Sequence, residues 1–168
     1  MEGVRSQPVK NSEPVITEGG KHLSIVYFNA RSLVPKLDEL CVLIENYKPH
    51  IICIVETWLC SDITDNEVTI PGFQLYRLDR NRHGGGILMY ISDKLTVCHL
   101  PAIVQDHNLE FLPLSVRFLD HKFCIAVFYR PPSAPSNIFD TLFHSIECID
   151  ISQFLNFISC RRFQCKHE

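Results

Sequence analysis

The stretch Ile51-Ile52-Cys53-Ile54-Val55-Glu56-Thr57-Trp58-Leu59 runs five apolar residues directly into a carboxylate. A short apolar run without polar interruptions is typical of a β-strand that is covered on both faces. Glu56 follows the carboxyl end of this predicted strand, where open α/β sheets place their ligands. A carboxylate so close to a buried strand needs a metal ion, a cation or water as its partner. The stretch therefore predicts a central strand over 51–55 and a candidate ligand at Glu56.

The residues before this stretch have the pattern of a strand followed by a helix. Leu23–Phe28 is apolar and predicts a strand, whereas the apolar residues of Leu33–Tyr47 recur at helical spacing. Ser32 is the expected N-cap of this helix, which should end before Pro49. A strand, a helix and a strand within about 35 residues predict a βαβ unit with two parallel strands.

The two parallel strands of this unit should end at the same edge of the sheet. The first reaches Asn29 and the second reaches Val55, directly before Glu56. Asn29 is either a turn residue, as asparagine often is after a strand, or part of a site that includes Glu56. Because the two strands end at the same edge, the second interpretation, in which Asn29 and Glu56 belong to one site, is favoured.

The second half of the chain predicts mostly strands. In order, the predicted strands are Phe73–Leu78, Ile87–Ile91, Leu95–Leu100, Leu109–Phe118 and Lys122–Tyr129. The last three should be antiparallel, with a tight turn at Asp120-His121, and Pro131-Pro132 ends the series because proline cannot continue a ladder. A helix should follow, then a strand over Phe154–Ile158. The apolar face of that helix is Phe139, Leu142, Phe143, Ile146 and Ile149.

A basic, glycine-rich segment separates two of these strands. It reads Asp79-Arg80-Asn81-Arg82-His83-Gly84-Gly85-Gly86, and Cys60–Pro71 before it has the composition of a loop. The glycines could cradle a phosphate beside the arginines, or they could form a hairpin turn with solvated arginines. Neither GxxxxGK nor GxGxxG spacing is present, so both interpretations stay open.

Length and composition indicate a single globular domain. The chain has 168 residues, 46% hydrophobic content and a net charge of −3, which excludes a general electrostatic attraction to nucleic acid. Residues 1–22 are polar and lack apolar periodicity, so we expect a disordered leader before a domain at 23–158. No apolar run approaches the ~20 residues that span a bilayer, and no signal peptide is evident. We therefore expect an intracellular chain without a membrane partner.

The eight cysteines do not indicate a disulfide framework. No CxxC pair occurs, so zinc-ribbon and redox motifs have no support, and no disulfide-linked partner is expected. Cys160, Cys165 and His167 could form a metal cluster, but no fourth ligand is evident. Five cysteines fall in apolar patterns and should act as small hydrophobic residues: Cys41, Cys53, Cys98, Cys124 and Cys148.

Four short motifs occur in a suggestive order. They are Phe28-Asn29-Ala30-Arg31-Ser32-Leu33, Glu56-Thr57-Trp58-Leu59, Gly84-Gly85-Gly86-Ile87 and Tyr129-Arg130-Pro131-Pro132. Together they resemble the N-terminal part of the endonuclease/exonuclease/phosphatase family, specifically the endonuclease domain of non-LTR (LINE-type) retrotransposon polyproteins that carry a reverse transcriptase. The resemblance implies an incomplete four-layer α/β sandwich: two packed mixed β-sheets with outer helices, and the C-terminal part missing.

The resemblance also implies a site and a reaction. The family activity is Mg²⁺-dependent (or Mn²⁺-dependent) phosphodiester hydrolysis, here expected to nick DNA. By this match Glu56 is the metal ligand, Asn29 supports the metal or the scissile phosphate, and Tyr129 helps to hold the phosphate. One or two protein carboxylates with waters and phosphate suffice for Mg²⁺. The candidate phosphate contacts are Arg31, Arg82 and Arg130.

The family pattern continues with two motifs, Gly-Asp-x-Asn and Ser-Asp-His, that this sequence lacks. Arg161–Glu168 can be encoded by codons that, read one base later, give Gly-Asp-Phe-Asn-Val-Asn-Met. We therefore hypothesise that residues 159–168 are a non-native tail, out of frame from near Cys160. The chain is then expected to be a catalytically impaired fragment. The alternatives are an active metal-dependent endonuclease and a non-catalytic binding remnant.

Overall fold

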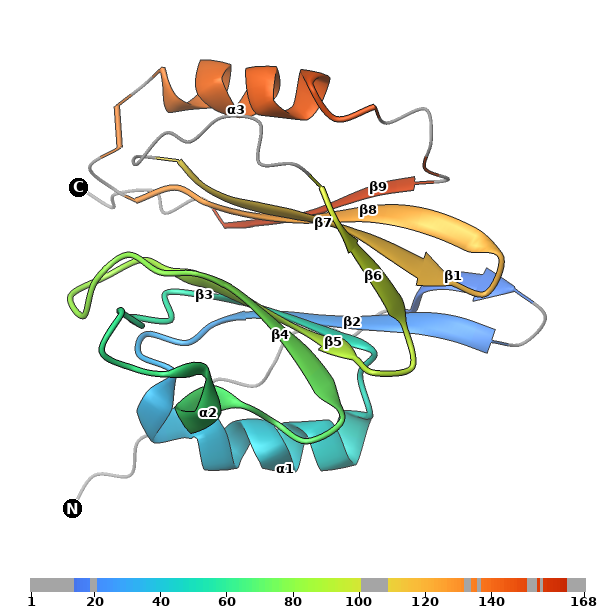
Figure 1. Ribbon diagram of the computed structural model, residues 1–168, viewed down its shortest axis with the longest axis horizontal. Coiled ribbons are helices and arrows are strands. Elements are labelled where there is room, and N and C mark those ends of the chain that lie inside the picture. Colours follow the sequence, from blue (N-terminus) through green and yellow to red (C-terminus); the bar gives the residue numbers. More distant parts are fainter. Residues whose placement is uncertain are drawn as a thin grey trace.

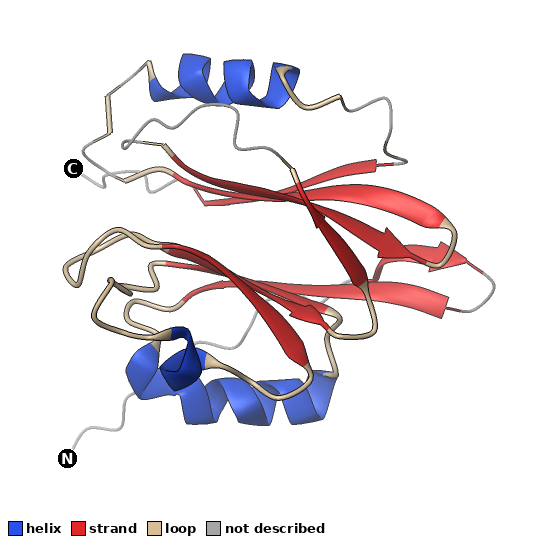
Figure 2. Ribbon diagram, in the orientation of Figure 1, coloured by secondary structure: helices blue, strands red, loops and turns tan. Residues whose placement is uncertain are grey.

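The computed structural model describes residues 14–18, 21–100, 109–131, 134–135, 137–150, 154 and 156–162. Two β-sheets pack face to face, and helices cover their outer faces (Figures 1 and 2). The layers therefore run helix, sheet, sheet, helix, which confirms the predicted α/β sandwich. None of the described helices is long and apolar enough to cross a membrane.

The first sheet contains the strand that ends at Glu56. Its order is β1 (Pro14–Glu18), β2 (Lys21–Asn29), β3 (Ile51–Val55), β5 (Ile87–Ser92) and β4 (Phe73–Leu78). β2 and β3 are parallel and are joined through the 3₁₀ turn η1 (Val34–Lys36) and α1 (Leu37–Tyr47). This arrangement confirms the βαβ unit. Every residue of β3 is buried, as its unbroken apolar run predicts.

The second sheet supplies the opposite wall of the core. Its order is β6 (Thr96–His99), β7 (Glu110–Phe118), β8 (His121–Tyr129) and β9 (Asn156–Arg162). The pairs β6–β7 and β7–β8 are antiparallel, as predicted, and β9 runs parallel to β8. Between β8 and β9, α3 (Ile138–Glu147) crosses the outer face of this sheet (Figure 1).

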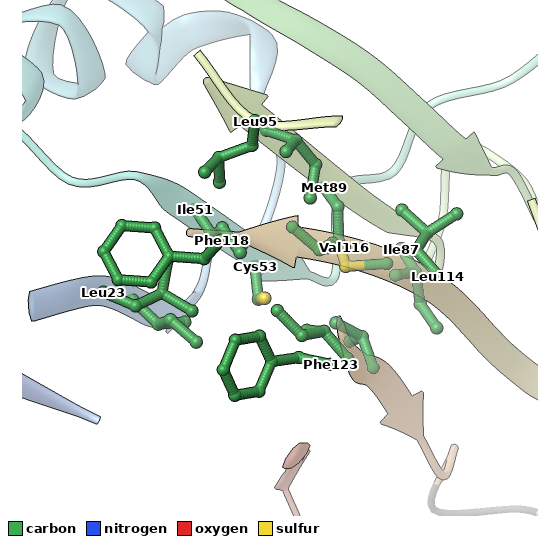
Figure 3. Packing of buried hydrophobic residues seen from close by; sticks show 14 of the residues in the cluster. Leu23, Ile51, Cys53, Ile87, Met89, Leu95, Leu114, Val116, Phe118 and Phe123 are labelled. Atoms are coloured by element: carbon green, nitrogen blue, oxygen red, sulfur yellow. The ribbon is translucent and has the colours of Figure 1, made fainter. Parts of the chain in front are cut away.

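Alternate residues of both sheets meet in one apolar core between them. Cys53 and Met89 of the first sheet and Val116 and Phe123 of the second belong to this cluster (Figure 3). Full burial of such a side chain contributes roughly 1.5–3 kcal/mol. The odd-numbered residues of β3 and the even-numbered residues of β7 therefore face this layer, and the same alternation decides which polar side chains reach the space between the sheets.

Two strands extend beyond the bounds expected from the sequence. The predicted leader includes β1, which pairs antiparallel with β2, while residues 1–13 and 19–20 lie outside the described part. Backbone pairing at a sheet edge does not require apolar periodicity, so composition alone missed this strand. Likewise β9 continues to Arg162, through residues 159–162 that were assigned to a tail. Residues 163–168 lie outside the described residues.

Two local features of the first helical region also differ from prediction. Ser32 is not an N-cap, because its φ is +76° and its N–H donates to the carbonyl of Glu56 at 3.0 Å. The helix starts later, after η1. The predicted loop at 60–71 contains the short helix α2 (Asp65–Val68), which a capping box between Thr64 and Glu67 stabilises.

The predicted turn and apolar faces need smaller corrections. The β7–β8 turn is Leu119-Asp120, because His121 already belongs to β8. Phe143 of α3 is 60% exposed instead of facing the core. Six cysteines whose side chains the structure describes are free, and Cys53 and Cys124 are buried as predicted. Three others are exposed because their elements bury only part of their surface: Cys41, Cys98 and Cys148.

Candidate functional site

Glu56 lies at the end of β3 and points into the layer between the sheets. By simple strand alternation it would face outward with Ile52 and Ile54, which pack in the outer cluster. Its φ of +57° breaks the alternation, and its carboxylate accepts a hydrogen bond from Tyr129 of the second sheet. Only 7% of Glu56 is exposed. A left-handed backbone at a residue other than glycine is costly, and such strain is often found at functional sites.

Three donors fix the Glu56 carboxylate. Oε2 accepts from the indole Nε1 of Trp58 at 2.6 Å and from the backbone N–H of Gly85 at 3.1 Å. The Tyr129 hydroxyl donates to Oε1. Hydrogen bonds to a carboxylate are about twice as strong as neutral ones, so these donors hold its orientation. A carboxylate has about four lone-pair sites, and the three donors leave room for one further partner.

The glycine-rich segment lies against Glu56 as a hairpin loop between β4 and β5. Its backbone pairs with the segment after Glu56, because Trp58 N–H donates to the Gly85 carbonyl at 3.0 Å. Gly85 and Gly86 have φ of +74° and +86°, and a Cβ on either would lie within 3.0 Å of a neighbouring side chain. Their N–H groups donate to the carboxylates of Glu56 and Glu110. The predicted hairpin is therefore present, although Arg77 and Arg80 pair with acids instead of being simply solvated, and close packing accounts for these two glycines.

Asn29 ends β2 beside Glu56. It is paired with Val55 in the parallel ladder, and the next residue, Ala30, donates its N–H to the Val55 carbonyl at 2.9 Å. Both polar atoms of the Asn29 side chain are buried and have no hydrogen-bond partner. Because buried polar groups are nearly always paired, an amide without a partner at this edge points to a bound ion or water.

Glu110 is a second buried carboxylate, and the sequence analysis did not single it out. It begins β7 directly opposite Tyr129 of β8, and only 5% of it is exposed. Its Oε2 accepts from the Gly86 N–H at 2.6 Å, and its Oε1 pairs with Arg80 at 3.2 Å. The signal was available: Glu110 occupies the inward-facing phase of an alternating strand, where a charge must find a partner.

The titration of Glu110 is expected to make stability depend on pH. Burial raises the pKa of this carboxyl above its ordinary value of 4.5, although the Gly86 N–H and Arg80 oppose the increase. The folded state then binds this proton more tightly than the unfolded state, so the stability that Glu110 contributes is fully present below its ordinary pKa of 4.5 and is lost as pH rises through its folded-state pKa.

Urea unfolding over a pH series checks this expectation. Wild type should lose stability relative to Glu110→Gln as the pH rises above 4.5. Glu39→Gln, the same change at an exposed position of α1, should follow wild type. A pH-independent difference between wild type and Glu110→Gln would contradict the assignment.

The three arginines that were predicted to contact phosphate lie in three different environments. Arg82 is exposed, and it contacts Asp62 at 3.1 Å. Arg31 is exposed beyond β2 with φ of +47°. Arg130 follows Tyr129 and therefore faces the outer side of its sheet, where its guanidinium donates to the Ala134 carbonyl at 3.1 Å. Arg130 thus lies against the α3 side of the sheet and Tyr129 against Glu56.

A cleft of about 480 Å³ lies at this edge of the first sheet. One wall is the segment from Cys60 to Asp62, and the other is the arginine-containing part of the β4–β5 loop, from Asp79 to His83. Both acids are paired, Asp62 with Arg82 and Asp79 with Arg77. The loop that forms the second wall continues along the chain into the glycine segment, where the N–H of Gly85 donates to Glu56.

The side chains around Glu56 suit one kind of metal ion. Among the residues that the structure describes, no three or more His, Cys, Asp and Glu side chains are grouped to hold a metal. One carboxylate and one buried amide, Glu56 and Asn29, match a hard cation such as Mg²⁺ that keeps several waters. The predicted cluster of Cys160, Cys165 and His167 lies outside the described side chains.

Solved structures share this fold at low sequence identity. The endonuclease domain of TRAS1, a telomere-specific non-LTR retrotransposon, matches with a TM-score of 0.60 and 14% identity over 85% of this chain and 59% of that one. The human Nocturnin catalytic domain with a bound sulfate anion matches with a TM-score of 0.60 and 15% identity over 84% of this chain and 64% of that one. An AP endonuclease from Archaeoglobus fulgidus matches with a TM-score of 0.58 and 16% identity over 82% of this chain and 55% of that one. The chain therefore spans less than two thirds of the length of each. No protein-family model and no curated protein sequence matches it.

Proposed function

We propose that this chain, which has the fold of the endonuclease/exonuclease/phosphatase superfamily, carries part of a Mg²⁺-dependent site for a DNA phosphodiester. The observation that carries the proposal is the buried Glu56 carboxylate, fixed by three donors beside the unpartnered amide of Asn29. Neighbours of the same fold are named as endonucleases, and one carries a bound sulfate anion, which supports a phosphate-containing ligand for this proposal.

Each residue of the proposed site has a distinct task. Glu56 and Asn29 would hold Mg²⁺ or Mn²⁺, which when bound supplies positive charge to the phosphate oxygens. Tyr129 orients the Glu56 carboxylate through its hydroxyl, and it would help to hold the phosphate. Arg82 lines the cleft, where an exposed guanidinium can exchange Asp62 for a backbone phosphate. Arg31 is exposed at the same edge, whereas Arg130 is engaged near α3 and is left out.

We propose further that these 168 residues bind without efficient turnover. Hydrolysis needs a base to aim water and a group to stabilise the leaving oxygen, and each such group is commonly worth ~10²–10³-fold in rate. The sequence contains neither Gly-Asp-x-Asn nor Ser-Asp-His. Glu110 does not replace the base, since both of its oxygens are engaged and it is 5% exposed.

A plasmid-nicking assay with Mg²⁺ tests this view of turnover. We expect wild type to nick supercoiled plasmid no faster than Glu56→Ala, which removes the proposed metal ligand. Mg²⁺-dependent nicking that Glu56→Ala abolishes would contradict the proposal. It would instead establish the second candidate, an active metal-dependent endonuclease.

A further inference from the structure

Two other arginines, Arg77 and Arg130, already have structural tasks. Arg77 is only 14% exposed at its side chain, and its guanidinium donates to the carbonyls of Ile63 at 2.9 Å and Cys60 at 3.1 Å while pairing with Asp79. Its donors are therefore engaged in holding the loop after Glu56. Arg130 lies over the ring of Phe139 at 5.6 Å. Neither can move to a ligand without breaking these contacts.

Arg80 differs because it joins the cleft to the buried part of the site. Its side chain is 38% exposed and lines the cleft, and its Nη1 pairs with Glu110 at 3.2 Å. Its stem passes over the glycine segment: a Cβ on Gly85 would lie 2.6 Å from Arg80 Cδ. The N–H of that glycine donates to Glu56. A guanidinium has five N–H donors, so one ion pair leaves others for a second anion.

Glu110 gives Arg80 a fixed anchor. It comes from the second sheet, is 5% exposed, and is itself held by the Gly86 N–H at 2.6 Å. An arginine held by a buried carboxylate loses less rotamer freedom on binding than a solvated one, because part of the ordering has already occurred. The pair thus presents a preorganised cation beside the backbone of Gly85 and Gly86, whose N–H groups hold Glu56 and Glu110.

We propose that Arg80 contacts a phosphate of the bound DNA strand and that Glu110 positions it for this contact. The inference rests on the proposed function, because it assigns the phosphate contact of the same site. Arg82 would then contribute a weaker contact farther along the cleft, since its partner Asp62 is 71% exposed and the pair is solvated.

The test measures binding of a labelled single-stranded DNA oligomer by fluorescence anisotropy in Mg²⁺. Arg80→Gln should weaken binding about tenfold, the effect of losing one charge-assisted hydrogen bond. It should also lower the slope of log affinity against log salt by about 0.7. Arg80→Lys keeps the positive charge and the aliphatic part of the side chain, so its DNA affinity should lie between those of wild type and Arg80→Gln. Arg117→Gln, an exposed arginine at the far end of β7, is the matched control and should bind as wild type.

Glu110→Gln separates positioning from simple electrostatics. Removing a negative charge would by itself strengthen DNA binding, whereas loss of the anchor should weaken it about threefold, a coupling typical of contacting residues. In an Arg80→Gln background the same change should then produce no weakening. Thermal unfolding of each variant confirms that the compared proteins are folded.

The possible outcomes distinguish a failure of this inference from a failure of the proposed function. If wild type binds the oligomer but Arg80→Gln binds equally well, or if Glu110→Gln strengthens binding, this inference is overturned and the Glu56 site stands. If wild type shows neither DNA binding nor a response of Trp58 fluorescence to Mg²⁺, the proposed function and this inference both fail.

Discussion

Replacing Glu56 with glutamine is expected to abolish the response of the protein to Mg²⁺ while leaving the chain folded. Glutamine has nearly the same shape and keeps an oxygen that can accept from Trp58 and Gly85, but it lacks the charge that a hard cation requires. Loss of a supporting residue at a metal site costs about 10–100-fold in affinity, so loss of the sole carboxylate ligand should cost at least that much.

The protein contains its own reporter for this experiment. Trp58 is the only tryptophan, and its indole N–H lies 2.6 Å from Oε2 of Glu56. A cation on that carboxylate should change the indole emission, so a Mg²⁺ titration followed by fluorescence gives the affinity without any turnover. Glu39→Gln on α1 should titrate as wild type, because that residue is exposed on the helix that covers the outer face of the first sheet, whereas the Glu56 carboxylate points between the sheets. A Glu56→Gln protein that titrates like wild type would rule out Glu56 as the ligand.

The centre of the first sheet was predictable because its sequence signals are strong. The unbroken run of β3 and the helical spacing before it could only be satisfied together by a βαβ unit. The missed elements have weaker signals. α2 is only four residues long, although Thr64 and Glu67 carry the capping-box spacing that marks a helix start. β1 is held by backbone pairing to β2, which leaves no periodic pattern to detect.

The candidate site could be predicted only in part from the sequence. Asn29 and Glu56 follow from the parallel unit, whereas the contact between Glu56 and Tyr129 spans 73 residues and depends on how the two sheets pack. The alternation along β8 already implied that Tyr129 and Arg130 face opposite sides of the sheet. The backbone of Glu56 was not predictable, since a φ of +57° reverses the direction that alternation gives.

Replacing Gly86 with alanine is expected to destabilise the fold by about 1–3 kcal/mol more than the same change at Gly72. Both glycines have φ of +86°, so both variants bear the left-handed penalty of about 1–2 kcal/mol. They differ in space: a Cβ at Gly72 meets nothing within 4 Å, whereas one at Gly86 lies closer than 3.0 Å to Oγ1 of Thr57. Thr57 is fully buried, so the added methyl overpacks the loop behind Glu56.

Urea unfolding of the two variants isolates this steric effect. Subtracting the stability lost in Gly72→Ala from that lost in Gly86→Ala removes the left-handed backbone penalty that both variants share. Combining Gly86→Ala with Thr57→Ala should then restore most of the difference, since Oγ1 of Thr57 is the atom that collides. Equal losses at Gly72 and Gly86 would show that the loop moves away from Thr57 freely. In that case the glycine segment would be too mobile to fix the carboxylates of Glu56 and Glu110 through its N–H groups, and the fixed orientation of Glu56 would need another explanation.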